Sequence, residues 1–161
     1  MPNGNTFDIP PIKDFILRNS VGELSVDPFA NKNRIAKITN DLDHTYGCTY
    51  SLDALEFLKL FKDECVDVLY FDPPYSPRQI SECYKKLGRS VNMETTQSSF
   101  WSKLKIEISR IVKPGGIVLS FGWNSGGIGM KYGFSMTEIL LVAHGGAHND
   151  TICTAEIKIQ K

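Results

Sequence analysis

Short runs rich in β-branched and aromatic residues alternate along this chain with segments of helical periodicity. The pattern predicts strands over 23–27, 35–40, 48–50, 66–71 and 116–122, and helices over 53–62, 77–87 and 97–112. Two further apolar runs, 134–142 and 151–159, are joined by a short loop and indicate a closing antiparallel hairpin. We therefore expect an α/β fold with a mostly parallel seven-stranded sheet and helices on both faces.

Several positions carry signals for the start or end of a helix. Asp53 is placed to cap the helix over 53–62, and Ser76 with Pro77 makes a similar start for the helix over 77–87, which Gly88 would end. The first ten residues show neither periodicity and are expected to form a flexible arm.

Size and charge limit the possible classes of protein. The 161 residues, 42% of them hydrophobic, predict a single domain over 1–161. Eighteen basic residues balance eighteen acidic ones, so any contact with nucleic acid must be local. The chain shows no leader pattern and no apolar run near the ~20 residues that span a bilayer. We expect a soluble cytoplasmic protein that does not enter a membrane.

The cysteines and histidines show no spacing typical of a metal site. Cys48, Cys65, Cys83 and Cys153 lack the CxxC pattern and are predicted to be buried free thiols in a reducing compartment. The three histidines are scattered as well, so no metal ligands are predicted.

The most informative motif is Asp72-Pro73-Pro74-Tyr75, directly after the apolar run 65–71. Both prolines hold φ near about −65° and offer carbonyl groups without N–H donors. The Asp72 carboxylate and the Pro73 carbonyl could each accept a hydrogen bond from an exocyclic amine, while Tyr75 stacks on the attached ring. A β-turn built on the two prolines is the purely structural alternative.

This motif resembles the catalytic motif of the S-adenosyl-L-methionine-dependent amino-methyltransferases, which modify N6 of adenine or N4 of cytosine. Other segments follow in the family's order: the N-terminal cofactor segment from Pro11 to Gly22, the first motif over 25–29, the acidic position at 39–42, the third motif over 53–58 and the turn over 113–116. The resemblance covers about residues 10–159 and implies a Rossmann-like class I methyltransferase fold.

The resemblance also implies roles for individual residues. It assigns catalysis to Asp72, Pro73, Pro74 and Tyr75, and cofactor binding to Pro11, Ile12, Asp27, Pro28, Phe29, Asn40, Asp41, Asp53 and Ala54. Asp27 would lie beside the amino-acid part of S-adenosyl-L-methionine, Asp41 would accept from the ribose hydroxyls and Asp53 would meet the adenine amine. Asp41 has a turn residue as its structural alternative, and Asp53 a helix cap.

Two loops depart from the family pattern or leave their role open. The loop over 29–34 lacks the glycines that let backbone approach the cofactor, although Asn31 and Asn33 tolerate left-handed geometry. The glycine-rich stretch over 122–129 is predicted to be a loop on the active-site side. Trp123 within it could equally wall the base pocket or belong to the core.

The predicted activity is methylation of a nucleobase amine, with adenine N6 in DNA ahead of RNA or cytosine. A base inside a duplex cannot reach such a pocket, so the substrate must be single-stranded or flipped out. The link over 89–96 is too short for a target-recognition domain, so sequence specificity would be weak or supplied by a second protomer or an accessory partner.

Two other classes of function stay open. A catalytically silent relative would keep the fold to bind nucleic acid or a partner, and methylation of a protein glutamine amide would use a similar set of acceptors. Tyr84, Lys85, Lys86 and Arg89 follow the motif and could contact phosphates, although a solvated helix face explains the lysines equally well.

Overall fold

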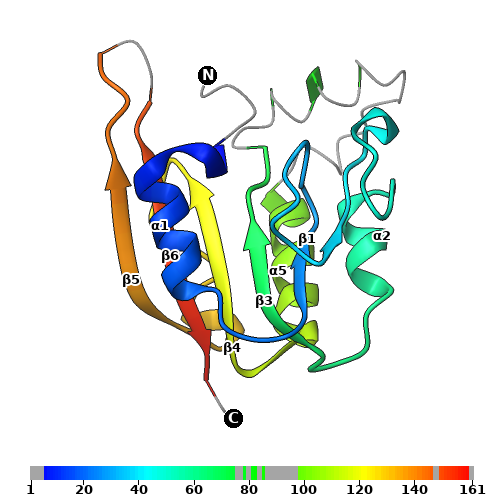
Figure 1. The fold of residues 1–161 in the computed structure, drawn as a ribbon. Coiled ribbons are helices and arrows are strands. Elements are labelled where there is room, and N and C mark those ends of the chain that lie inside the picture. Colours follow the sequence, from blue (N-terminus) through cyan, green and yellow to red (C-terminus); the bar gives the residue numbers. More distant parts are fainter. Residues whose placement is uncertain are drawn as a thin grey trace.

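A six-stranded sheet with helices on both faces forms the described part of the chain (Figure 1). The structure is a computed structural model that describes residues 6–74, 78, 81, 82, 85, 98–146 and 149–159. The strand order is β2-β1-β3-β4-β6-β5. The strands are β1 (Ser25–Asp27), β2 (Ile38–Thr39), β3 (Val66–Phe71), β4 (Val112–Gly122), β5 (Phe134–Val142) and β6 (Thr151–Lys158).

Strand directions confirm the predicted architecture. Strands β2, β1, β3 and β4 are parallel neighbours, whereas β6 is antiparallel to both β4 and β5. The strand predicted over 66–71 and the hairpin predicted over 134–142 and 151–159 are confirmed, the last ending one residue earlier at Lys158. The sheet is therefore mostly parallel and closes with an antiparallel hairpin.

The prediction of a seventh strand over 48–50 is wrong for the described residues. Only a parallel bridge between Asn40 and Tyr50 forms there. Beyond it the Asn40 side chain bonds the backbone of Leu52, since its Oδ1 accepts from the Leu52 N–H at 2.9 Å and its Nδ2 donates to the Leu52 carbonyl at 3.0 Å. The side chain thus takes the backbone groups that would continue a ladder.

The first two strands are shorter than predicted. We expected β1 over 23–27, but the N–H groups of Glu23 and Leu24 donate to the Asp67 carboxylate and so are not available to a ladder. We expected β2 over 35–40, but the Lys37 N–H donates to the Ser25 hydroxyl at 2.9 Å. Side chains therefore set where both strands begin. Strand β4 is longer than the predicted 116–122, because Val112 already pairs with Val66.

The helices are α1 (Pro10–Asn19), α2 (Ala54–Lys59) and α5 (Ser98–Ile111), with 3-10 turns η1 (Thr6–Asp8), η2 (His44–Tyr46) and η3 (Met130–Tyr132). Helix α5 agrees with the prediction over 97–112, and α2 is shorter than 53–62. The helix predicted over 77–87 lies largely outside the described residues. No helix in the described ranges combines the length and apolar character needed to cross a membrane.

The N-terminal segment is packed, so the predicted flexible arm is wrong for residues 6–10. The Phe7 ring is buried, with its centroid 4.7 Å from that of Phe121 and 6.0 Å from that of Tyr70. Pro10 and Pro11 then begin α1, where a missing N–H costs no helical hydrogen bond.

The hydrophobic core has two halves, one on each face of the sheet. Helix α1 covers one half, which includes Phe15, Phe121 and Cys153, while α2 and α5 cover the other, which includes Phe57 and Leu104. Cys48, Cys65 and Cys153 are free thiols, as predicted. Only Cys153 of these three is buried, so the prediction of burial is wrong for the other two, and Cys83 lies outside the described residues.

Candidate active site

Three aspartates lie where the parallel strands end. Asp27 is the last residue of β1, Asp72 follows β3, and Asp41 comes shortly after β2. The arrowheads of β1, β3 and β4 point to the top of Figure 1, and we refer to this side of the sheet, where the parallel strands end, as an edge. Strand β1 has β2 on one side and β3 on the other, so the order of the sheet reverses here. Open α/β sheets bind ligands at such a point.

Asp27 is a buried carboxyl group, with 1% of its surface exposed. Its Oδ1 accepts a hydrogen bond from the Phe29 N–H at 2.9 Å. Burial raises the pKa of Asp27 well above its usual value, and the negative charges of Asp72 and Asp41 raise it further. A cation placed beside Asp27 would therefore be stabilised by the carboxylate and would in turn favour its ionised form.

Asp72 is half-buried and is followed by a buried Pro73 and a half-buried Pro74. Its charge acts on Asp27 in β1 and also on Cys153 in β6, whose pKa rises to about 12 mainly through burial. Asp72 therefore lies within electrostatic reach of both strands, and Cys153 belongs to the half of the core that α1 covers. Tyr75, the fourth residue of the motif, lies outside the described residues.

The start of α1 lies at the same edge of the sheet as these aspartates (Figure 1). Pro11 is exposed there, whereas the Ile12 side chain is fully buried in the core. The predicted N-terminal cofactor segment thus reaches the expected edge, with Pro11 available to a ligand and Ile12 used for packing.

The loop after β1 closes without glycine. Asn31 takes the left-handed conformation, with φ of 50°, and its N–H donates to Asp41 Oδ2 at 2.9 Å. The other carboxylate oxygen of Asp41 accepts from the Asp43 N–H at 2.9 Å. Burial raises the pKa of Asp41, and these two bonds oppose the rise. Asn31 therefore provides the left-handed backbone geometry that glycine most often supplies.

Two more predicted cofactor residues have structural roles. The Asn40 side chain is fully buried and also donates to the Pro28 carbonyl at 3.1 Å, so its amide links the two loops at this edge. Asp53 caps α2 by accepting from the Leu55 N–H at 2.9 Å, and Ala54 is buried. The cap is thus confirmed for Asp53, and its contact with a cofactor stays a prediction.

Several solved structures of methyltransferases have a similar fold. The chain matches TrmN from Thermus thermophilus with a TM-score of 0.59 and 18% identity, over 93% of this chain and 49% of TrmN. It matches the 1,6-didemethyltoxoflavin-N1-methyltransferase of Burkholderia thailandensis, solved with S-adenosylhomocysteine, with a TM-score of 0.62 and 9% identity, over 96% and 79%. It matches an rRNA methylase from Streptococcus thermophilus with a TM-score of 0.55 and 13% identity, over 91% and 94%.

The chain has the class I methyltransferase fold. No protein-family model and no curated protein sequence matches it. The chain spans about half the length of TrmN. Because all three identities are below 20%, the likeness establishes the fold and leaves the reaction to be tested.

In this methyltransferase fold the glycine-rich loop after β4 turns away from the aspartates. Glu156 of β6 is buried, and its carboxylate accepts from the N–H groups of Ile128 at 2.6 Å and Gly129 at 2.9 Å. A Cβ atom on Gly127 would lie 2.2 Å from Glu156 Oε2. The second half of the loop therefore leaves the candidate active-site edge, contrary to the prediction, and packs along the α5 face, where Lys105 donates to the Gly127 carbonyl and Ile128 joins the core. The sequence feature that could have indicated this packing is Glu156, a single acidic residue within the apolar run of β6.

Trp123, for which the sequence allows a wall of the base pocket or a place in the core, lies near the candidate site. Trp123, directly after β4, is 40% exposed, so the core alternative is wrong. Lys85 is exposed as well, whereas Tyr84, Lys86 and Arg89 lie outside the described residues. Trp123 therefore lies at the surface, at the edge of the sheet that carries Asp72.

Proposed function

We propose that this protein transfers a methyl group from S-adenosyl-L-methionine to an exocyclic amine of a nucleobase, in the first place N6 of adenine in DNA. The observation that carries the proposal is the pair of neighbouring carboxyl groups at the strand-order reversal, Asp72 with its two prolines after β3 and the buried Asp27 at the end of β1. The methyltransferase fold supports the same reaction class.

The residues at this edge fit the chemistry of the cofactor. S-adenosyl-L-methionine has an ammonium group, a sulfonium cation and ribose hydroxyls, all of which carboxylates stabilise. Asp27 would hold the ammonium group, and Asp41 would accept from the ribose in addition to its two backbone donors. Asn40 and Asp53 keep the surrounding loops in place. When bound, the cofactor supplies the methyl group.

Asp72 and Pro73 would act on the target amine. The amine's lone pair is delocalised into the base, which makes it a poor nucleophile. Hydrogen bonds from its two N–H groups to the Asp72 carboxylate and the Pro73 carbonyl would favour a pyramidal nitrogen and direct the lone pair at the methyl carbon. The surplus amine proton would then pass to solvent, and the methyl carbon would exchange its bond to sulfur for a bond to nitrogen. Tyr75 would stack on the base and replace the stacking lost when the base leaves a duplex.

The proposed substrate is single-stranded or flipped-out DNA, read with little sequence specificity. With zero formal net charge, the protein lacks the basic excess of proteins that bind phosphates over a wide surface. A homodimer or an accessory partner would then supply specificity. The likeness to an rRNA methylase makes RNA the first alternative substrate.

Transfer of tritiated methyl groups to DNA and to RNA tests the proposal. The products are digested to nucleosides and separated, which identifies the base and the atom that is modified. We expect N6-methyladenine from single-stranded DNA. Replacing Asp72 by Ala should lower the rate about 100-fold or more, because a hydrogen-bond acceptor of the transition state is lost.

Cofactor affinity, measured by calorimetry, distinguishes the possible outcomes. Asp72→Ala should bind S-adenosyl-L-methionine as the natural chain does, since Asp27 and Asp41 are kept. Unchanged transfer by Asp72→Ala would contradict the role of the motif. Binding of nucleic acid without any transfer would favour the catalytically silent alternative, and label found only in protein would favour a glutamine amide.

A further inference from the structure

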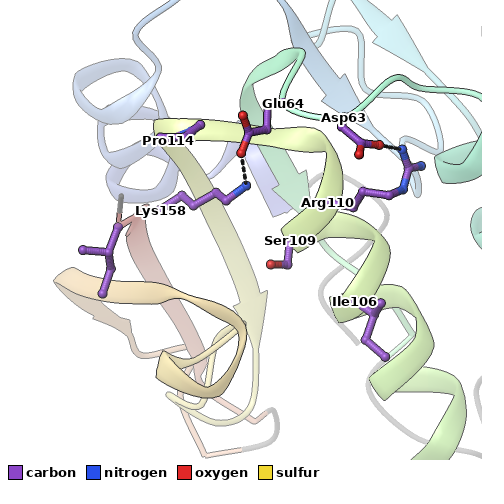
Figure 2. Close-up of a pocket in the computed structure, with 8 residues that line it drawn as sticks. Asp63, Glu64, Ile106, Ser109, Arg110, Pro114 and Lys158 are labelled. Atoms are coloured by element: carbon purple, nitrogen blue, oxygen red, sulfur yellow. Dashed lines mark hydrogen bonds and ion pairs between the residues drawn. The ribbon is translucent and has the colours of Figure 1, made fainter. Parts of the chain in front are cut away.

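A cavity of about 410 Å³ lies at the opposite edge of the sheet, where β3 and β4 begin and β6 ends (Figure 2). Its volume falls in the range of small-molecule sites. It is lined by Asp63, Glu64, Ile106, Ser109, Arg110, Pro114, Lys158 and Ile159. None of these residues belongs to the proposed active site.

Lys158 is a nearly buried cation with few partners for its positive charge. Its side chain is 11% exposed, and its ammonium group donates to the Val112 carbonyl at 2.7 Å. Glu64 Oε1 lies 3.7 Å from the Lys158 Nζ, too far for a good hydrogen bond. An ammonium group has three donors, so Lys158 has capacity for a further acceptor.

Arg110, the other cation of the cavity, already has acceptors for its hydrogen-bond donors. Its five N–H groups are engaged by Glu107, by Asp63 and by the carbonyls of Leu58 and Phe61. Asp63 is thereby neutralised as well, with its Oδ1 2.7 Å from the Arg110 guanidinium. An anion entering the cavity would therefore be attracted to Lys158.

Glu64 is held beside this cavity by an uncommon backbone conformation. Its φ is 49°, which residues other than glycine adopt rarely, and its N–H donates to the Arg110 carbonyl at 3.0 Å. The Glu64 side chain is 58% exposed, and Figure 2 shows it facing Lys158. Because the pair is long and one partner is solvated, an external anion can replace Glu64 at low cost.

The remaining walls are apolar and fixed in place. Ile106 and Ile159 are exposed beside Pro114. Hydrogen bonds hold these walls, one from the Ile159 N–H to the Gly133 carbonyl at 2.9 Å and one from the Ser109 hydroxyl to the Tyr132 carbonyl at 2.7 Å. A ligand would therefore meet a preformed apolar surface next to one cation.

We infer that this cavity binds a small amphipathic anion with a single negative charge. Its carboxylate or sulfonate group takes the place of Glu64 at the Lys158 ammonium, and its apolar body lies against Ile106, Pro114 and Ile159. A single charge fits best because the Glu64 carboxylate lies in the same cavity and repels a second one.

Fluorescence titration with 1-anilinonaphthalene-8-sulfonate, compared with the neutral N-phenyl-1-naphthylamine, tests this site. We expect saturable binding of one sulfonate probe, tighter than that of the neutral probe. Lys158→Met should weaken sulfonate binding about tenfold or more, because a charge-assisted hydrogen bond is lost. Glu64→Gln should strengthen it about threefold or more, since the competing carboxylate is removed.

Matched controls separate the site from binding elsewhere. Lys62 is an exposed lysine that directly precedes Asp63 and Glu64 but does not line the cavity. Lys62→Met should therefore leave the affinity for the sulfonate probe unchanged. Ile106→Glu, at an exposed position that should not disturb folding, should abolish sulfonate binding. Equal affinity for the two probes, or no change in both Glu64→Gln and Ile106→Glu, would overturn the inference even if Lys158→Met fails to fold.

Discussion

Asp67 and Asp27 are hydrogen-bonded aspartates at opposite edges of one sheet, and their surroundings differ. Asp67 accepts from the Lys113 ammonium at 2.6 Å and from two backbone N–H groups, and the bond to Lys113 lowers its pKa. Asp27 accepts from a single backbone N–H, and burial raises its pKa. The ionised form of Asp67 therefore stabilises the fold, whereas ionising Asp27 costs stability.

The same contrast extends to the neighbouring charges. At the edge where β3 begins, Arg110 pairs with Asp63 and Glu107. At the other edge, Asp27 and Asp41 form no ion pair with any described residue, and Arg34 donates to the carbonyls of Asn31, Asn33 and Tyr46 instead. At the first edge Asp63, Asp67 and Glu107 are thus paired with cations, whereas at the other edge Asp27 and Asp41 have no ion pair with a described residue, at some cost in stability.

The largest effect on stability is expected from Arg110→Met. The substitution removes the bonds that join α5 to the end of α2 and leaves the carbonyls of Leu58 and Phe61 without this donor. We expect the free energy of unfolding to fall by about 2–3 kcal/mol, measured by urea denaturation. Arg34→Met, at an exposed position on the other edge, should cost about 1 kcal/mol or less. Equal losses would contradict the difference between the edges.

Smaller effects on stability are expected from two single substitutions, Asp67→Asn and Asp27→Asn. Asparagine at 67 keeps one acceptor but loses the ion pair with Lys113, which should cost about 1–2 kcal/mol at pH 7. Asparagine at 27 keeps the bond from Phe29 and removes a buried charge, so the change should stay within about 1 kcal/mol. A loss at 27 as large as that at 67 would show that the Asp27 charge is structural.

The smallest effect is a difference in pH dependence. Asp27 has a raised pKa, so the folded state binds more protons than the unfolded state and the stability contributed by this group is lost as pH rises from about 4 through the folded pKa. Asp67 has a lowered pKa, so its contribution is present above about pH 4 and is lost as pH falls through the folded pKa.

Unfolding measured from pH 3 to 7 should therefore give slopes of opposite sign for these two groups. As pH rises, the natural chain should lose stability relative to Asp27→Asn and gain stability relative to Asp67→Asn. Parallel curves for the two variants would contradict both assignments.

Much of the fold could be predicted because it depends on local patterns. The apolar run of β3 and the two runs of the hairpin specify their strands without reference to distant residues. The missing seventh strand depends on the Asn40 side chain bonding Leu52, a tertiary contact that no periodicity reveals. The burial of Phe7 could likewise not be predicted, because its partners, Tyr70 and Phe121, are distant in the chain.

The candidate site could be predicted in part. Asp27, Asp41 and Asp72 reach one edge because parallel strands end on the same side of the sheet. Their catalytic and cofactor roles stay predictions, as does that of Tyr75. The turn role offered for Asp41 is confirmed by the bond from the Asp43 N–H, whereas its bond from Asn31 and the structural task of Asn40 could not be inferred, since they depend on how the loops fold back on each other. Glu156 was missed because its partners are backbone groups of a distant loop.

The contact between Gly127 and Glu156 matters for anyone who wishes to alter this fold by mutagenesis. Gly127 has a φ of 48° and lies against the Glu156 carboxylate, so every side chain at this position meets both backbone strain and collision. Four residues earlier, Trp123 is exposed and faces no such restriction. Randomised libraries should vary 123 and spare 127, which keeps diversity next to the candidate active-site edge and preserves the bond from the Gly126 N–H to Asn124.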